Sequence, residues 1–376
     1  MGRIKNLFEI TSKFRCHVDV STLKPYGSGH INDTYRLKNL AGTEYDYLLQ
    51  KINNDIFTDV PRLTENMCRV IAHLKGKMDA SGEGDPQKEV MTLIATKTGP
   101  YFYEDSNGHY WRMCLFLKDT RSYDVVETEK QAYEGGKAFG KFQAMLSDLP
   151  ADIMHEVIPD FHNIKKRLGQ LNQAVKENPK GRAGLVFQEL EAIKKRSEVM
   201  SFFQEAAQQL TLPRRVIHND TKFNNVLLDL KGNAQCVIDL DTVMAGYVAY
   251  DFGDAIRTIA NTAAEDEIEL SRIQLNLDLF NAYTKGYMES AASFLKEWEL
   301  RSLIKGVLLM PYMQAVRFLT DYLNGDKYYK IRSVEHNLER TRAQLQLLKL
   351  LEAQATAMEK TILAEAKKYR KHFVKL

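Results

Sequence analysis

Three oxygen-bearing side chains follow short apolar runs within one stretch of the chain. Asp220 comes after an apolar run that ends at His218, Asn225 follows a polar loop of four residues, and Asp239 ends the apolar run beyond a turn at Gly232. A carboxylate can accept the proton of a hydroxyl group, and amide and carboxylate oxygens are suitable ligands for Mg²⁺. Phosphoryl transfer requires this set, because the protein mainly positions an acceptor and holds metal against nucleotide phosphates. The pattern predicts Asp220 as the base and Asn225 and Asp239 as metal ligands.

The order His-x-Asp-x-x-x-x-Asn, followed by an apolar strand that ends in Asp, resembles the catalytic and metal loops of the protein-kinase-like superfamily. Lys222 matches the lysine that faces the transferred phosphate in protein kinases. The segments Ile238-Asp239-Leu240-Asp241 and Tyr250-Asp251-Phe252-Gly253 resemble the aminoglycoside phosphotransferase and choline kinase family, which phosphorylates small molecules. This resemblance implies that His218 and Asp251 are structural residues of the catalytic loop, and that Asp241 helps to bind metal or acceptor.

Other stretches resemble the N-acetylhexosamine 1-kinases within that family, and the resemblance extends from about Tyr26 to the 340s. It is carried by Gly27 to Tyr35, by Gly246-Tyr247 and by Arg317 to Tyr322. It implies an α+β, bilobal, kinase-like fold that uses ATP and Mg²⁺. An N-terminal lobe, residues 1–117, would hold an antiparallel sheet and one helix. A larger, mainly helical C-terminal lobe, residues 118–376, would end in a long helix.

The N-terminal part offers candidate residues for nucleotide binding. Gly27-Ser28-Gly29 lies between two expected strands, where glycines let backbone amides approach phosphate oxygens, although a plain hairpin turn is the alternative. Asn32 and Thr34 would add side-chain donors. The strand over residues 45–52 ends in Gln50-Lys51, and Lys51 is the candidate cation for the phosphates. Because side chains alternate along a strand, only one of Gln50 and Lys51 can point into the cleft.

A helix is predicted from Asp59 to about Lys75, followed by a polar loop over residues 79–90. The resemblance implies a glutamate on this helix that pairs with the strand cation, and Glu65 is the candidate. Glu65 falls nearly opposite the apolar face of the helix, so exposure to solvent is the alternative. Farther along, the resemblance implies that backbone groups of Phe116-Leu117 meet the adenine at an interlobe hinge.

The pattern from Thr128 onwards predicts helices, including one over residues 185–210 and one over residues 334–371. Apolar residues in the last helix recur at intervals of three and four. We expect a monomer whose last helix packs on the lobe, and a dimer seam along this helix is the alternative. The seam residues would be Leu348, Leu351, Ala355, Met358 and Ile362.

The amino-acid composition limits the classes of protein and of binding partner that remain possible. The chain has 376 residues, 44% of them apolar and 27% charged, which predicts a globular protein with two lobes. A net charge of +3 is too small to indicate a nucleic-acid partner. No apolar run approaches the roughly 20 residues of a membrane span, so we expect no membrane partner. The four scattered cysteines are typical of free thiols in a reducing, cytoplasmic setting.

The class of acceptor depends on Arg257 and Arg317, which reach the cleft if the sugar-kinase resemblance holds. Arginines there oppose cationic acceptors and favour a neutral or anionic sugar, whereas a salt bridge between Arg317 and Asp321 is the alternative. Tyr328 or Tyr329 would stack on the sugar or bond to it. The predicted reaction is transfer of the γ-phosphoryl group of ATP to a sugar hydroxyl, the anomeric one of an N-acetylhexosamine. The alternatives are homoserine, choline, ethanolamine or an aminoglycoside as acceptor, or a nucleotide-binding protein without catalysis.

Overall fold

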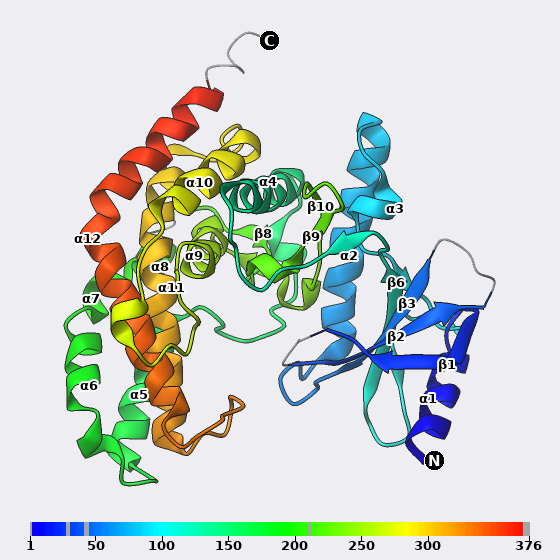
Figure 1. Ribbon diagram of the computed structural model, residues 1–376, viewed down its shortest axis with the longest axis horizontal. Helices are drawn as coiled ribbons and strands as arrows, with labels where there is room; N and C mark the ends of the chain where they lie inside the picture. The colour runs from blue at the N-terminus through cyan, green and yellow to red at the C-terminus, as the bar shows by residue number, and fades with distance from the viewer. Residues whose placement is uncertain (1, 28–30, 41–44, 210–211, 371–376) are drawn as a thin grey trace. The chain divides into compact units, whose positions relative to one another are not determined.

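The computed structural model describes residues 2–27, 31–40, 45–209 and 212–370, and the side chains from residue 7 onwards. Contacts divide the chain into two compact units (Figure 1). The first unit comprises Met1–Ser122, Asp148–Pro159 and Val226–Met244, and the second comprises Tyr123–Ser147, Asp160–Asn225 and Ala245–Leu376. The lobe boundary between residues 117 and 118 stays a prediction.

An antiparallel sheet forms the centre of the first unit, as the sequence predicts. Its strands run in the order β1-β2-β3-β6-β4, and β5 pairs with β6. Each neighbouring pair is antiparallel. The strands are β1 (Val18–Pro25), β2 (Asp33–Asn39), β3 (Asp46–Ile52), β4 (Leu93–Ile94), β5 (Tyr103–Glu104) and β6 (Tyr110–Phe116).

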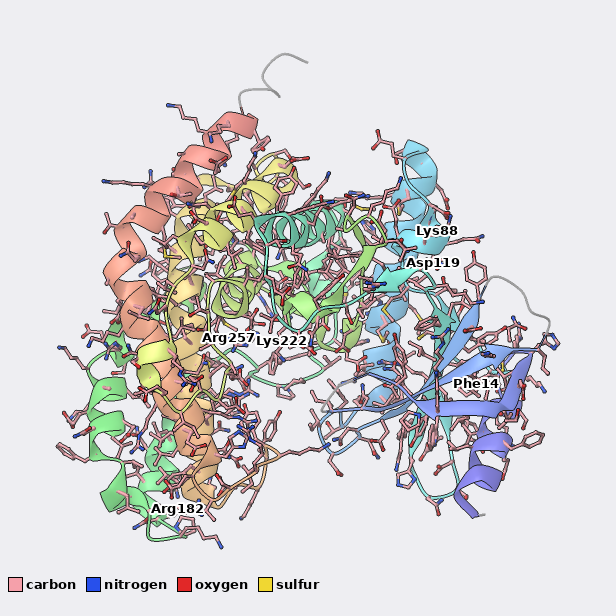
Figure 2. All side chains as sticks on the ribbon, viewed as in Figure 1. Phe14, Lys88, Asp119, Arg182, Lys222 and Arg257 are labelled. Carbon is pink, nitrogen blue, oxygen red and sulfur yellow. The ribbon has the colours of Figure 1, made fainter. Side chains whose placement is uncertain are left out.

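One face of this sheet packs on the N-terminal helix α1 (Gly2–Ser12) and the residues just after it. Phe14, labelled in Figure 2, is fully buried in this cluster together with Leu49 of β3 and Met113 of β6. Because side chains alternate along a strand, the neighbouring residues of β3 and β6 lie on the opposite face. That second face carries the polar network described below.

Helix α2 (Val60–Ser81) begins as the sequence predicts but continues six residues past Lys75. Asp59 caps its first turn, accepting a hydrogen bond from the backbone of Arg62, and Gly82 ends it in the left-handed conformation. The loop predicted over residues 79–90 is therefore wrong in part. Asp85 caps a further short helix, α3 (Pro86–Glu89), within it.

A second, smaller sheet of the first unit consists of three antiparallel strands in the order β10-β9-β7. Strands β9 (Val226–Asp229) and β10 (Ala234–Val237) form the predicted hairpin, and Gly232 takes a left-handed φ of 78° in its turn. The third strand is β7 (Thr120–Arg121). The hairpin leads into the 3-10 helix η4 (Leu240–Thr242), which follows Asp239.

The second unit is mainly helical, as the sequence predicts, and contains one pair of short strands, β8 (Arg215–Ile217) and β11 (Met244–Gly246). The single helix expected over residues 185–210 is wrong, because Ser197 and Ser201 bond to preceding carbonyls and interrupt the helix. The helices are α4 (Glu129–Met145), α5 (Ile164–Glu177), α6 (Phe187–Lys194), α7 (Ser197–Met200), α8 (Phe202–Gln208), α9 (Val248–Ile259), α10 (Leu277–Ala291), α11 (Glu297–Asn324) and α12 (His336–Arg370).

Helix α12 runs beside α10 and α11 (Figure 1). Four of the five apolar residues that could have formed a dimer seam are buried within the chain, each at most 2% exposed: Leu348, Leu351, Met358 and Ile362. This stripe therefore belongs to the core of the second unit and leaves no free seam. No helix within residues 2–370, as far as they are described, combines the length and the apolar character that crossing a bilayer requires.

Glycines let α4 and α10 approach each other at backbone distance. A Cβ atom on Gly136 would come within 3.0 Å of the Tyr283 carbonyl oxygen, and one on Gly286 would overlap the Tyr133 carbonyl oxygen in the same way. Both collisions are with backbone, which cannot rotate away as a side chain can. The close packing of α4 on α10 thus depends on the absence of side chains at these positions.

We expect Gly286→Ala to lower the free energy of unfolding by about 3 kcal/mol, because overpacked helices must separate. The control is Gly169→Ala on α5, where an added Cβ meets nothing within 4 Å. This second change should be neutral or stabilise by about 0.5–1 kcal/mol, since alanine has the higher helix propensity. Urea denaturation measures both variants, and equal midpoints would contradict the close approach.

Candidate active site

The loop from His218 to Asn225 is held by one buried carboxylate, that of Asp251 in the first turn of α9. Asp251 accepts hydrogen bonds from the backbone N–H groups of His218 at 2.8 Å and Asn219 at 2.7 Å. Gln143 of α4 donates a third at 2.8 Å. In return, the Thr221 hydroxyl donates to the Asp251 backbone carbonyl. These bonds fix the loop, including the left-handed φ of 67° at Asn219.

His218 is fully buried below the same loop. Its ring packs against Phe139 and Phe142 of α4, with centroids 5.7 and 5.8 Å away. Its Nδ1 atom accepts a hydrogen bond from the backbone N–H of Asp220 at 3.3 Å. The histidine therefore supports the backbone at the candidate base.

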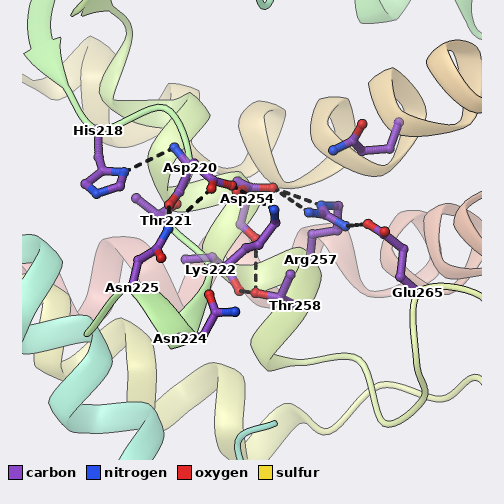
Figure 3. A network of polar contacts seen from close by, with 12 residues as sticks. His218, Asp220, Thr221, Lys222, Asn224, Asn225, Asp254, Arg257, Thr258 and Glu265 are labelled. Atoms are coloured by element: carbon purple, nitrogen blue, oxygen red, sulfur yellow. Dashed lines mark hydrogen bonds and ion pairs between the residues drawn. The ribbon is translucent and has the colours of Figure 1, made fainter. Parts of the chain in front are cut away.

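Asp220, Lys222 and Asn225 lie close together in this loop, with Asn225 buried and the other two partly exposed (Figure 3). Lys222 Nζ is 3.0 Å from Asp220 Oδ1. Burial raises the pKa of Asp220, but the charge and hydrogen bond of Lys222, together with the charge of Arg257, outweigh burial and leave this pKa below its usual value. The charge of Asp220 raises the pKa of Lys222 in turn. The aspartate is therefore ionised at neutral pH and can accept a hydrogen bond from an acceptor hydroxyl.

Asn225 ends the 3-10 helix η3 (Phe223–Asn225) with its amide orientation fixed. Its Nδ2 atom donates to the Asp220 backbone carbonyl at 2.8 Å and approaches Asp220 Oδ2 at 3.3 Å. Since the nitrogen is used in this way, the amide oxygen is the atom left for a cation. Asp239, in the first unit, precedes η4 with a left-handed φ of 61°.

These two predicted ligands are an amide and a carboxylate, both hard oxygen donors. Within the described parts of the chain, no group of three or more His, Cys, Asp or Glu side chains forms a closed metal cluster. A sparse oxygen set fits Mg²⁺, which keeps several waters and shares its remaining positions with nucleotide phosphates. The donor chemistry thus suits the predicted ion.

In the first unit, Arg112 of β6 forms a buried ion pair with Asp241 of η4. The guanidinium donates to both Asp241 oxygens, and its Nε donates to Gln50 Oε1 at 2.8 Å. The two charged side chains are 1% and 4% exposed. Asn32 Nδ2 also donates to Asp241 Oδ2, at 2.7 Å. Both oxygens of Asp241, a predicted metal ligand, are therefore engaged by protein donors.

The two predicted nucleotide donors at the start of β2, Asn32 just before the strand and Thr34 within it, are also engaged within the first unit. Asn32 Oδ1 accepts from the backbone N–H of Asn53 at 2.9 Å, and Thr34 Oγ1 accepts from Gln50 Nε2 at 3.1 Å. Gly27 takes a left-handed φ of 82° at the end of β1. Ser28 and Gly29 lie outside the described residues.

Gln50 and Lys51 lie on opposite faces of β3, and Gln50 shares the face of Arg112. Lys51 pairs in register with Trp111, on the face that packs on α1. Glu65 is half-exposed on α2, and its carboxylate binds His155 Nε2 at 2.7 Å and Arg69. An ion pair between Glu65 and Lys51 is absent from the described part of the chain. The roles of Lys51 and Glu65 toward a nucleotide stay predictions.

The two expected hinge residues are the last residue of β6, Phe116, and the residue after it, Leu117. The Phe116 ring contacts the Tyr26 ring at 5.2 Å between centroids, and the Arg36 guanidinium lies 3.9 Å from its centre. Leu117 is buried, and its carbonyl accepts a hydrogen bond from the Thr120 hydroxyl at 2.8 Å. Their contact with adenine stays a prediction.

The two predicted acceptor arginines have different environments in the second unit. Arg257 is buried and neutralised by Asp254 at 2.8 Å and Glu265 at 2.7 Å (Figure 3). Figure 2 places it beside Lys222. Arg317 instead lies over the rings of Tyr328 and Tyr329, 5.8 and 5.6 Å from their centres.

The alternative salt bridge from Arg317 to Asp321 is not formed among the described residues. The Asp321 carboxylate is buried and accepts hydrogen bonds from the backbone N–H groups of Lys327, Tyr328 and Tyr329 at 2.9 to 3.0 Å. Asp321 therefore positions the tyrosine loop, and Arg317 faces the aromatic rings of that loop.

A family model described as "Phosphotransferase enzyme family" matches residues 22–289, most of the chain. The chain belongs to this family. It is thus a phosphotransferase, as the sequence predicts, and its fold matches those of solved kinases.

Three solved structures resemble this phosphotransferase in fold, with TM-scores of 0.55 to 0.57. An aminoglycoside phosphotransferase from Alicyclobacillus acidocaldarius is 10% identical, with 97% of this chain and 96% of that chain covered, at a TM-score of 0.56. A microcompartment-associated aminopropanol kinase is 14% identical, with 95% and 98% covered, at 0.57. A Plasmodium vivax ethanolamine kinase is 13% identical, with 86% and 83% covered, at 0.55.

The sequence reasoning missed one charged residue of this phosphotransferase's polar networks, Arg112. The available signal was a lone cation between Trp111 and Met113 in an otherwise apolar strand. Such a residue is buried only when a partner meets it, and that partner, Asp241, lies 129 positions away. The pairing therefore left no local pattern.

We expect Asp241→Asn to lower the free energy of unfolding of the phosphotransferase by about 3–5 kcal/mol, because it leaves the Arg112 charge buried without its counter-ion. Asp55→Asn removes an exposed carboxylate of the same unit and should change stability by less than about 0.5 kcal/mol. Replacing both partners, as Arg112→Met with Asp241→Leu, should be less damaging than Asp241→Asn alone. Urea denaturation of the unchanged protein and the three variants measures these differences in stability. If Asp241→Asn were as stable as Asp55→Asn, the stabilising role of the ion pair would be refuted.

Proposed function

We propose that this phosphotransferase is a small-molecule kinase that transfers the γ-phosphoryl group of ATP to a sugar hydroxyl, the anomeric hydroxyl of an N-acetylhexosamine. The observation that carries the proposal is the position of the Asp220 carboxylate. It is held on a braced loop, with Lys222 at 3.0 Å, in the same unit as an arginine and tyrosine cluster. A base and a site suited to a polar acceptor thus occur in one compact part of the chain.

In this reaction Asp220 orients the acceptor hydroxyl and takes its proton as the hydroxyl oxygen bonds to the γ-phosphorus. The bond from that phosphorus to the bridging oxygen breaks, and ADP leaves with the electron pair. Lys222 balances the negative charge of the transferred group. Because Asp251 and His218 hold the loop backbone, Asp220 is positioned before the acceptor binds.

Asn225, through its amide oxygen, and Asp239 are the proposed Mg²⁺ ligands. Bound there, the ion would neutralise phosphate charge. Both oxygens of Asp241 already accept hydrogen bonds. We therefore propose that Asp241 contributes by holding Arg112 in place. For the nucleotide, Gly27, Lys51 and the backbone of Phe116 and Leu117 stay the proposed contacts.

The charge of the second unit supports a sugar over a cationic acceptor. The similar structures include an aminopropanol kinase and an ethanolamine kinase, named for amino alcohols, which carry an ammonium group at neutral pH. Here Arg317 stands among tyrosines without a carboxylate partner in the described residues, and a cationic acceptor would be repelled. An aromatic side chain such as the half-exposed Tyr328 suits the face of a sugar ring.

We expect Asp220→Asn to lower kcat by about 10²–10⁴-fold, because an amide cannot take the hydroxyl proton. Affinity for ATP should be unchanged, since the loop backbone is held by Asp251. Asp278→Asn, an exposed carboxylate on α10, is the matched control and should keep full activity. Steady-state ADP release and calorimetric titration with a non-hydrolysable ATP analogue provide the two readouts. An Asp220→Asn enzyme with normal kcat would show that the base lies elsewhere.

An acceptor panel tests the reaction itself. ADP release is measured with N-acetylglucosamine, N-acetylgalactosamine, homoserine, choline, ethanolamine and an aminoglycoside. We expect turnover of an N-acetylhexosamine, with a sugar 1-phosphate as product, since the charge of Arg317 disfavours cations. Turnover of choline or an aminoglycoside without any sugar would contradict the sugar assignment. Absence of ADP release with every acceptor would favour the non-catalytic alternative.

A further inference from the structure

Two arginines of the second unit approach the same aromatic residue from different helices. Arg167 of α5 donates to the Phe161 carbonyl at 3.3 Å and to Gln170 Oε1 at 3.1 Å. Arg317 of α11 lies 5.3 Å from the centre of the Phe161 ring. Among the described residues, neither guanidinium forms an ion pair with a carboxylate. Two positive charges therefore flank Phe161 without counter-ions of their own.

The nearby carboxylates are already used by other cations. Asp220 is paired with Lys222, whereas Asp254 and Glu265 both bind Arg257. Asp160, the acidic residue that acts on Arg167, forms an ion pair with Lys166 at 2.6 Å.

The two arginines also oppose each other. Burial lowers the pKa of Arg167, and the charge of Arg317 lowers it further. Like charges this close are stabilised by an anion that both can bind, because guanidinium groups bind carboxylate and phosphate oxygens in pairs. Among the residues that the structure describes, no carboxylate pairs with either arginine at this position.

Neighbouring polar groups lack partners as well. Both ring nitrogens of His162, which is 8% exposed, and the hydroxyl of Tyr329 are buried without a hydrogen bond, as is Nε of Arg167. Burial, followed by the charges of Arg317 and Arg167, lowers the pKa of His162 to about 3, so its ring is neutral. Buried polar groups without partners cost about 1–3 kcal/mol each, and several in one place indicate a polar ligand.

This cluster adjoins the candidate base. The charge of Asp220 acts on His162, whose ring contacts Phe161 at 4.4 Å between centroids. The rings of Tyr328 and Tyr329 also lie near the Arg317 guanidinium, at 5.8 and 5.6 Å from their centres. A molecule with its hydroxyl at Asp220 would therefore extend toward both arginines.

We infer that the acceptor carries an anionic group, a carboxylate or a phosphate ester, which Arg167 and Arg317 hold while the acceptor hydroxyl lies at Asp220. His162 and Tyr329 would bond to neutral polar groups of the same molecule. This inference rests on the proposed function and narrows its acceptor to acidic sugars. Arg167 then selects the substrate and takes no part in the chemistry.

The test compares three matched acceptors in the ADP-release assay: N-acetylglucosamine, its 6-phosphate and the corresponding uronic acid. At least one charged sugar should exceed the neutral one in kcat/KM by about 10–100-fold, since charge-assisted hydrogen bonds contribute that much. The difference should lie in KM and diminish at high ionic strength. The two charged sugars distinguish a phosphate ester from a carboxylate.

Variants separate this role from a general loss of function. Arg167→Gln should lower kcat/KM for the preferred charged sugar about tenfold or more beyond its effect on the neutral sugar. Arg167→Lys should recover part of that loss. Lys165→Gln removes a positive charge from the exposed face of the same helix and should leave the preference intact. Thermal unfolding of each variant controls for folding.

The outcomes also separate the inference from the proposed function. Faster turnover of neutral than of charged sugars, or equal losses in Arg167→Gln, would overturn the inference and leave the kinase assignment in place. If no sugar is turned over, the proposed function fails, and ligand-induced thermal shifts still decide the inference. A shift with a charged sugar that disappears in Arg167→Gln supports it, and shifts equal to that of neutral N-acetylglucosamine contradict it.

Discussion

The loop from His218 to Asn225 is held in the second unit by the buried carboxylate of Asp251, which must accept hydrogen bonds to be stable there. Asp251 obtains them from the backbone of His218 and Asn219 and from Gln143, so the loop can take only the conformation that aims these groups at α9. The close packing of α4 on α10 keeps Gln143 in place. Through this chain of contacts, the tight helix packing determines where Asp220 stands.

In the first unit, a buried ion pair between two side chains has a similar stabilising role. Arg112 and Asp241 are both almost fully buried, and each is stable there only because the other is present. Gln50 and Asn32 add hydrogen bonds from two further strand regions. These contacts connect the strands β6 and β3 to η4, the 3-10 helix that follows Asp239.

Features with a local signal could be predicted from the sequence. The antiparallel strands, the start of α2 at its Asp59 cap, the β9–β10 hairpin and the His218 to Asn225 loop all follow from patterns a few residues long. Features that depend on distant partners could not. The contact of Glu65 with His155 and the arginines around Phe161 depend on residues distant in the sequence, although the helical period already indicated that Glu65 could be exposed. The helix breaks after Lys194, whose carbonyl accepts a hydrogen bond from the Ser197 hydroxyl.

The mutual dependence of Arg112 and Asp241 limits how this protein can diverge. Replacing one of the two residues by a neutral one leaves the other charge buried without a counter-ion, so most such single substitutions should destabilise the protein. The ion pair can therefore be lost in evolution only if both residues change nearly together, or if other substitutions first stabilise the first unit. The two positions should therefore drift as a single evolutionary character, while the surrounding surface varies site by site.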